Sequence, residues 1–144
     1  MPVAAETRIT PGTAEIQSSC FGCGPQHPQG LRLRFSLTAD GSVLARWTPD
    51  QTWQGFRGIV HGGILSTVLD EAMSKAVVAR GCHALTAEMR VRFRHPATTG
   101  QLLVIRGRVL DHTRRRVRTE ATVSAADGRE LAHAWGTFLS PLKD

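Results

Sequence analysis

The sequence has no apolar run long enough to cross a membrane, because none approaches the ~20 residues that a helical span requires. Its first residues, Met1 to Glu6, lack the basic stretch and apolar core that mark a secretory signal peptide. Cysteine is scarce, and an odd count of 3 does not suit a secreted scaffold held by disulfides. We therefore expect a cytoplasmic protein with reduced thiols and no membrane span.

Acidic residues are also in deficit, since 12 Asp and Glu face 18 Lys and Arg and give a formal net charge of +6. A positive balance favours anionic partners such as nucleic acid or a phosphate-bearing cofactor. Arg114, Arg115 and Arg116, followed by Arg118, fall at a predicted hairpin tip. No aromatic residues alternate with these arginines, so a base-stacking surface for nucleic acid is not predicted. A solvated basic turn and a phosphate-binding site both stay open.

The 144 residues, 41% of them hydrophobic, suit one domain with a single core. Residues 1–19 are polar and irregular and are predicted to form an N-terminal arm, which leaves 20–144 as the domain. One helix is predicted from about Gly62 to Arg80, because apolar doublets recur every four residues and Gly81 supplies a stop.

Most of the remaining domain alternates with a period of two, which is typical of half-buried strands. Two strands are predicted before the helix, one carried by Leu31, Leu33, Phe35 and Leu37 and its hairpin partner at 43–47. Four more follow the helix, at about 88–94, 102–110, 117–124 and 131–139. Their short connections favour antiparallel neighbours. One helix and about six antiparallel strands predict an α+β fold in which the sheet packs on the helix.

The most informative motif is His61-Gly62-Gly63, a glycine loop that runs directly into the predicted helix. A helix start presents unpaired N–H groups at the positive end of the dipole, and glycine lets a ligand approach the backbone. Such a site can stabilise an oxygen that gains negative charge. Asp70 lies about two turns further on, where a carboxylate could attack an activated acyl group or activate water for that attack.

Asp70 and its neighbour Glu71 point about 100° apart on the helix. Glu71 has Lys75 four residues later, an arrangement typical of a solvated surface ion pair. Asp70 has Ser66 and Ser74 at the same spacing and no cation on the helix to neutralise it. We therefore favour Asp70 as the functional carboxylate and expect Glu71 to be structural.

Cys20 and Cys23 form a C-x-x-C pair, and His27 lies four residues after it. Three such side chains could bind zinc, but a structural site needs a fourth ligand and the sequence has no second C-x-x-C. We expect a buried or loop-forming thiol pair and no metal site. His61 is likewise expected to shape its loop, in preference to transferring a proton or binding metal.

The order of strands, glycine loop, long helix and four antiparallel strands resembles the hotdog fold. His61-Gly62-Gly63, with Asp70 nine positions after the histidine, is similar to the acyl-CoA thioesterases of the phenylacetate-pathway (PaaI-like) and 4-hydroxybenzoyl-CoA type. The flanking residues 58–60 and 69–73 agree with this, and 20–31 resemble the lead-in of many members.

The resemblance implies an enzyme that cleaves acyl-CoA to a carboxylic acid and free CoA, with CoA part of the substrate and no separate cofactor. Carried over by position, Gly62 of one subunit polarises the thioester carbonyl, His61 shapes the loop, and Asp70 of another subunit is nucleophile or general base. It also implies a homodimer or a dimer of dimers. The residues expected to contact substrate flank the motif, supply an apolar acyl end or face the phosphates of CoA: Gly63, Gln54, Trp53, Phe56, Met73, Ser74, Arg114, Arg115 and Arg116.

One position departs from the family pattern. Several members place Asn or Gln six residues before the histidine, where this chain has Gly55, with Gln54 beside it as a candidate replacement. Two other functions stay open: a non-catalytic acyl-CoA-binding protein, and a hydratase or dehydratase on the same fold. The second would need an Asp-His pair about five residues apart at a loop–strand junction, which the sequence lacks. The residues do not distinguish aromatic from medium-chain acyl groups.

Overall fold

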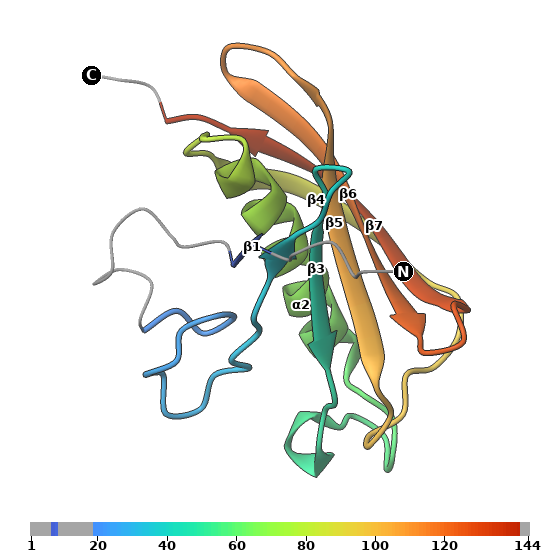
Figure 1. Cartoon of the computed structure of the whole chain (residues 1–144). Coiled ribbons are helices and arrows are strands. Elements are labelled where there is room, and N and C mark those ends of the chain that lie inside the picture. The colour runs from blue at the N-terminus through green and yellow to red at the C-terminus, as the bar shows by residue number, and fades with distance from the viewer. Residues whose placement is uncertain (1–6, 9–18, 142–144) are drawn as a thin grey trace.

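The protein folds as one long helix on one face of an antiparallel sheet (Figure 1). This computed structural model describes residues 7–8 and 19–141. The helix is α2 (Gly62–Ala79) and a short 3-10 helix, η1 (Gln51–Trp53), precedes it. Seven strands are paired in the order β1-β2-β3-β5-β6-β7-β4. Their bounds are β1 Thr7–Arg8, β2 Ser36–Leu37, β3 Val43–Trp47, β4 Leu85–Phe93, β5 Leu103–His112, β6 Arg116–Ala125 and β7 Glu130–Leu139.

This arrangement confirms the predicted hotdog fold, with β1 and β2 reduced to two residues each. The predicted helix is also confirmed. It is capped by His61, and it ends at Ala79 just before Gly81, whose φ of 75° lies in the left-handed region that favours glycine. No helix in the described part of the chain is both long and apolar enough to cross a bilayer. The predicted arm at 1–19 lies outside the described residues except for Thr7–Arg8 and Ser19.

Two glycines let α2 approach the middle of the sheet closely. A Cβ on Gly107 of β5 would come within 2.4 Å of the carbonyl oxygen of Ala72, so the helix backbone lies directly against the strand. A Cβ on Gly136 of β7 would meet the sulfur of Met73 at 2.9 Å. The core between helix and sheet is formed by buried apolar residues from both, including Leu69, Met73, Ile105, Val123 and Phe138.

The strand predicted over Leu31 to Leu37 is wrong for most of its length, since only Ser36–Leu37 pair as a strand. Leu31, Leu33 and Phe35 are buried in the core, as their alternation predicts. Their segment, however, runs along the side of α2 that faces away from the sheet (Figure 1). The backbone N–H groups of Leu31 and Leu33 donate to the carbonyl oxygens of Phe21 and Gly22. Alternating burial therefore arises here from packing on a helix, with a preceding loop as hydrogen-bond partner.

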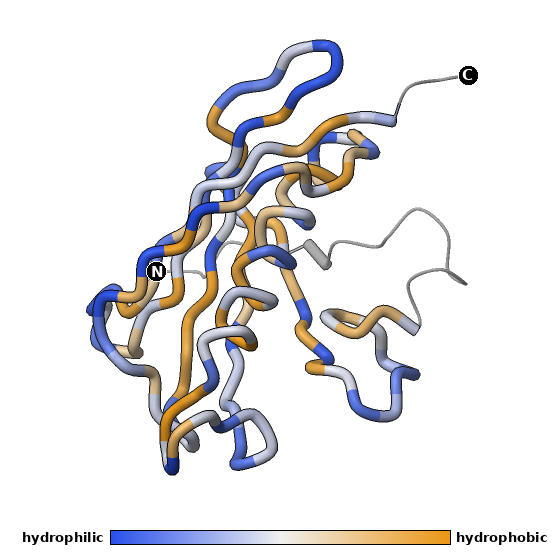
Figure 2. Tube along the Cα trace, turned by 180° about the vertical axis from the view of Figure 1, so that it is seen from behind, coloured by the Kyte–Doolittle hydropathy of each residue, from blue (hydrophilic) through white to orange (hydrophobic). Residues whose placement is uncertain are grey.

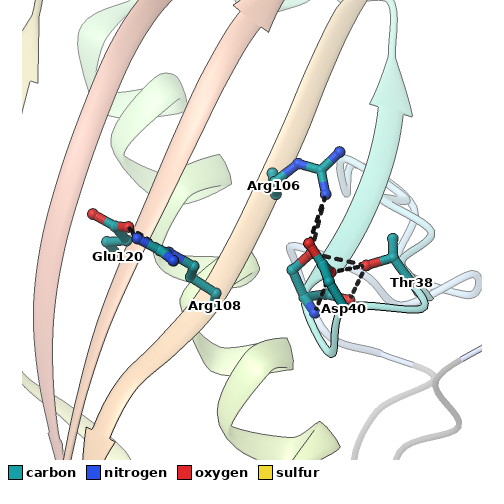
Figure 3. Close-up of polar contacts among 6 residues, drawn as sticks. Thr38, Asp40, Arg106, Arg108 and Glu120 are labelled. Carbon is teal, nitrogen blue, oxygen red and sulfur yellow. Dashed lines mark hydrogen bonds and ion pairs between the residues drawn. The ribbon is translucent and has the colours of Figure 1, made fainter.

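Polar contacts lie at the β2–β3 turn and on the face of the sheet away from α2 (Figure 3). Asp40 accepts hydrogen bonds from Ser42 and Thr38 across the β2–β3 turn, and these bonds hold the pKa of its carboxyl well below the usual range. Arg108 of β5 pairs with Glu120 of β6. Such contacts fix the turn and the strand pair without entering the core.

Candidate active site

The start of α2 is organised by His61. Its Nδ1 accepts a hydrogen bond of 2.9 Å from the N–H of Gly63, while its carbonyl accepts from the N–H groups of Ile64 and Leu65. This is an N-terminal cap supplied by an imidazole, and it requires Nδ1 to be unprotonated. The cap supports the expected loop-shaping role of His61 and removes Gly63 from the set of free donors.

Gly62 and Gly63 therefore differ in whether their backbone N–H groups are free. Within the described residues, the N–H of Gly62 has no hydrogen-bond partner, and Gly62 is exposed. Gly62 lines a pocket of about 310 Å³ with Ile59, Phe93 and Pro96 among its walls. A free N–H at the positive end of a helix, beside an apolar pocket, is suited to a carbonyl oxygen that gains charge.

Asp70 is half-buried on the side of α2 that faces β4. Its Oδ1 accepts a hydrogen bond of 2.7 Å from the hydroxyl of Thr86. The hydroxyl of Ser66 instead donates to the carbonyl of Gly62, so it does not hold Asp70 as the spacing suggested. Sequence reasoning missed Thr86, because nothing local shows that the first strand after the helix returns beside Asp70.

Within one chain, Gly62 and Asp70 cannot act on the same carbonyl. They are eight residues apart on one helix, and a rise of about 1.5 Å per residue separates them by about 12 Å along its axis. A carbonyl must lie about 3 Å from both its hydrogen-bond donor and the attacking group. Within one chain the two groups are therefore too far apart to form a single site around one carbonyl.

The loop before α2 is a compact turn. The side-chain oxygen of Gln54 accepts from the N–H of Gly58 at 3.1 Å, and the N–H of Gly55 donates to the carbonyl of Ile59. Gln54 therefore stabilises its own loop. Phe56, at the tip, is 86% exposed, a large apolar side chain that nothing in this chain covers among the described residues.

The remaining candidates for substrate contact lie in different places. Trp53 packs against Phe21 and Trp47 and lines a pocket of about 660 Å³ beside them. Ser74 is half-buried one turn after Asp70. Met73 is fully buried against β7, so the structure places it in the core and away from any surface that a substrate could reach.

The arginine tip (Arg114–Arg116) forms the exposed β5–β6 turn and the first residue of β6, and Figure 2 shows it as the hydrophilic end of that hairpin. The sheet register places Arg116 opposite Leu139 of β7, which is in turn opposite Leu85 of β4. Leu85 precedes Thr86, the partner of Asp70. The arginine tip and Asp70 therefore lie toward the same end of the sheet.

Glu71 differs from its predicted environment. Its side chain is only 15% exposed and Lys75 is buried, with 3.6 Å between Lys75 Nζ and Glu71 Oε1. The cover is the loop that carries Cys20 and Cys23. Burial, and then the charge of Glu71, raise the pKa of the Cys23 thiol to about 12, so it is protonated at neutral pH and unsuited to nucleophilic attack.

Comparison with known proteins identifies the superfamily of the chain. Residues 57–132, which include the glycine loop, Asp70 and most of the sheet, match the thioesterase superfamily. The chain belongs to the thioesterase superfamily. No match was found among curated proteins.

Solved thioesterases share the fold. Protein RHA08564, a thioesterase superfamily protein, aligns with a TM-score of 0.83 and 26% identity over 96% of this chain and 69% of its own. Protein smu.793 of Streptococcus mutans, solved with acetyl CoA bound, aligns with a TM-score of 0.68 and 23% identity over 72% of this chain and 83% of its own. The PaaI protein of the phenylacetic acid degradation operon of E. coli aligns with a TM-score of 0.66 and 18% identity over 69% of this chain and 76% of its own. These likenesses show that the chain shares the fold of PaaI and of other solved thioesterase superfamily proteins.

The cap at the start of α2 gives a testable prediction. His61→Ala should lower the free energy of unfolding by about 0.5–2 kcal/mol, because the Gly63 N–H loses its partner. His61→Asn should retain most of the stability, because the Asn side-chain oxygen can accept the Gly63 hydrogen bond in place of Nδ1. Urea denaturation of the three proteins measures both changes. Equal losses in the two variants would show that the imidazole acts through packing and not as a cap.

Proposed function

We propose that this protein hydrolyses acyl-CoA thioesters to a carboxylic acid and free CoA. The observation that carries the proposal is the free N–H of Gly62 at the start of α2. The N–H of Gly63, in contrast, already donates to Nδ1 of His61. The Gly62 N–H polarises the thioester carbonyl, the carbonyl carbon is attacked, and the C–S bond breaks to release the thiolate of CoA. The superfamily and the acetyl CoA held by the S. mutans relative support this substrate class.

Asp70 supplies the attack in either of two balanced ways. Its carboxylate adds to the carbonyl and forms an anhydride that water then hydrolyses, or it takes a proton from a water molecule that adds directly. The Thr86 hydroxyl acts as a positioning group, because its hydrogen bond fixes one carboxylate oxygen and leaves the other to react. CoA is part of the substrate, and the absence of a further cofactor and a cytoplasmic location both stay predictions.

A complete site requires a second copy of the chain, because the two groups are about 12 Å apart along one helix. The edge of the sheet offers the means. Among the described strands, β4 pairs only with β7, so its other side presents nine residues of unpaired backbone. Its two end residues, Leu85 and Phe93, are 71% and 52% exposed. A long edge strand with exposed apolar side chains at both ends is a template for pairing with another chain.

Two-fold symmetry determines which residues of the two copies lie opposite each other when the β4 strands pair. Antiparallel pairing of two β4 strands about Met89, the middle residue of the strand, places Leu85 of one copy opposite Phe93 of the other. Phe93 is next to Gly62, since a Cβ added to Gly62 would lie 3.6 Å from the Phe93 ring. Leu85 is next to Thr86 and hence to Asp70. The dimer thus brings Gly62 of one copy to Asp70 of the other, and it brings the exposed Phe56 loop to a surface that can cover it.

The arginine tip is proposed to bind the phosphates of CoA. Some other arginines have acidic partners: Arg94 pairs with Glu130, and Arg118 pairs with Asp111. For Arg114, Arg115 and Arg116, no ion pair is present among the described residues. Their charge is therefore available at the end of the sheet where Asp70 lies, and guanidinium groups suit phosphate oxygens. Gln54, Gly63, Trp53 and Ser74 stay candidates for lining the acyl side.

The first test is release of free thiol from a panel of acyl-CoA substrates. Asp70→Asn should lower kcat at least ~10²-fold, the scale of a lost acid–base group, without a large change in melting temperature. Asp127→Asn, in the exposed β6–β7 turn, is the matched control and should keep full activity. Saturable binding without turnover of any substrate would instead support the non-catalytic acyl-CoA-binding protein.

Complementation tests the shared site. Gly62→Pro removes the N–H, yet proline suits the first helical position, and the φ and ψ of His61, −59° and 134°, are compatible with a following proline. Loss of this donor should lower kcat about 10²–10³-fold, whereas Gly62→Ala keeps the N–H. Mixing Gly62→Pro with Asp70→Asn should restore about a quarter of wild-type activity at full subunit exchange, since each mixed dimer has one intact site. No recovery after proven exchange would contradict the dimer.

The arginine tip is tested by replacing Arg114, Arg115 and Arg116 with Ala. The KM for acyl-CoA should rise at least about 10-fold, because each charge-assisted hydrogen bond contributes about 1.5–3 kcal/mol. The KM for a thioester of N-acetylcysteamine, which lacks the nucleotide, should change little. Arg129→Ala, in an exposed turn at the other end of the sheet, is the control. Equal effects on both substrates would indicate another role for the tip.

A further inference from the structure

The loop with the two cysteines places three metal-ligating side chains around one point. Cys20 Sγ, Cys23 Sγ and a carboxylate oxygen of Glu71 all lie within 4.8 Å of one another, and Cys20 Sγ is 4.0 Å from Glu71 Oε1. All three residues are half-buried. Glu71 is 48 positions after Cys23, so the tertiary fold, and not a local turn, completes the group.

The loop backbone is shaped to bring the thiols to the carboxylate. Gly22, between the two cysteines, is buried against Glu71, where a Cβ would lie 2.6 Å from Oε2. Its carbonyl accepts from the N–H of Leu33, and the carbonyl of Cys20 accepts from the N–H of Gly24. A side chain at position 22 would displace the carboxylate from the thiols. The close approach is thus a property of this glycine.

We propose that Cys20, Cys23 and Glu71 bind one divalent metal ion of the zinc class. A tetrahedral ion with Zn–S bonds of about 2.3 Å and Zn–O bonds of about 2.1 Å needs its ligand atoms about 3.6–3.8 Å apart. Because the three ligand atoms lie at most 4.8 Å apart, each pair would need to close by about 1.2 Å or less. The charges also balance, because the ion neutralises two thiolates while Lys75, 3.6 Å from Glu71 Oε1, neutralises the carboxylate.

The ligand set differs from the one that sequence spacing suggests. His27 is not part of the group, since its Nδ1 accepts from the N–H of Gln29 and its ring packs edge-on against Phe21. Three protein ligands leave one tetrahedral position for water. A metal here would fasten the 20–23 loop to the helix turn that carries Asp70. The proposal does not depend on thioesterase activity, because its readout is metal binding.

The test uses the full-length protein, reduced, treated with a chelator and titrated anaerobically with Co²⁺. One cobalt per chain should bind, with the near-ultraviolet charge-transfer absorption of thiolate ligands and the intense visible bands of tetrahedral cobalt. Cys20→Ser or Cys23→Ser should reduce the charge-transfer absorption by about half. Each should weaken binding at least about 10-fold, the lower bound for disturbing even an outer partner of a metal site.

Two further variants test the third ligand. Glu71→Gln should keep the charge-transfer absorption of two thiolates but weaken cobalt binding at least about 10-fold. Gly22→Ala should weaken binding by displacing the carboxylate, with both thiols intact. Cys82→Ser, which alters a cysteine that contacts His112 outside this group, should match wild type. Melting temperatures of the metal-free variants identify any that fail to fold.

Three results would overturn the site. They are cobalt binding without charge-transfer absorption, wild-type affinity in both cysteine variants, and no binding at all. Wild-type affinity in Glu71→Gln would remove Glu71 from the ligand set and with it the three-ligand site. Loss of binding in Cys82→Ser would assign the metal to a different place.

Discussion

The contact between the backbone of α2 and strand β5 at Gly107 determines the roles of the residues around it. Because Ala72 lies directly against β5, the rotation of the helix relative to the sheet is fixed at that turn. Successive helical residues point about 100° apart. With Ala72 against the sheet, Asp70 faces β4 and accepts from Thr86, while Glu71 faces the cysteine loop. Three adjacent residues thus contact three different parts of the molecule.

A second constraint is the length of the helix. Eight residues separate the free donor at its start from the carboxylate on its side, and a straight helix cannot bring them together. Among the described strands, β4 has one unpaired edge with apolar side chains at both ends, a state that invites uncontrolled association unless the edge is covered. The self-pairing about Met89 that we propose would answer both problems at once. It would cover the edge, and it would align the donor of one copy with the carboxylate of the other.

Sequence predicted the elements with strong periodicity and missed contacts that depend on sheet order. The helix from Gly62 and the four strands after it follow from apolar spacing and glycine stops, and the structure confirms them. The segment from Leu31 to Phe35 shows that alternation also arises when an extended chain packs on a helix. Thr86 could not be predicted as the partner of Asp70, because no local pattern shows that β4 is an edge strand beside β7.

The environment of Glu71 and Lys75 is also a contact that the sequence could not predict. Their i,i+4 spacing is typical of a solvated pair, and spacing alone cannot reveal a loop that covers it. The covering loop belongs to the segment 20–35, which lies on the side of α2 away from the sheet (Figure 1). A carboxylate held under this loop, with one lysine nearby, interacts more strongly with charge than an exposed pair does, because water screens it less. Position in the fold, more than residue type, therefore separates the two neighbouring carboxylates: Asp70 lies at an open edge that a second copy can complete, and Glu71 lies beneath two thiols of its own chain.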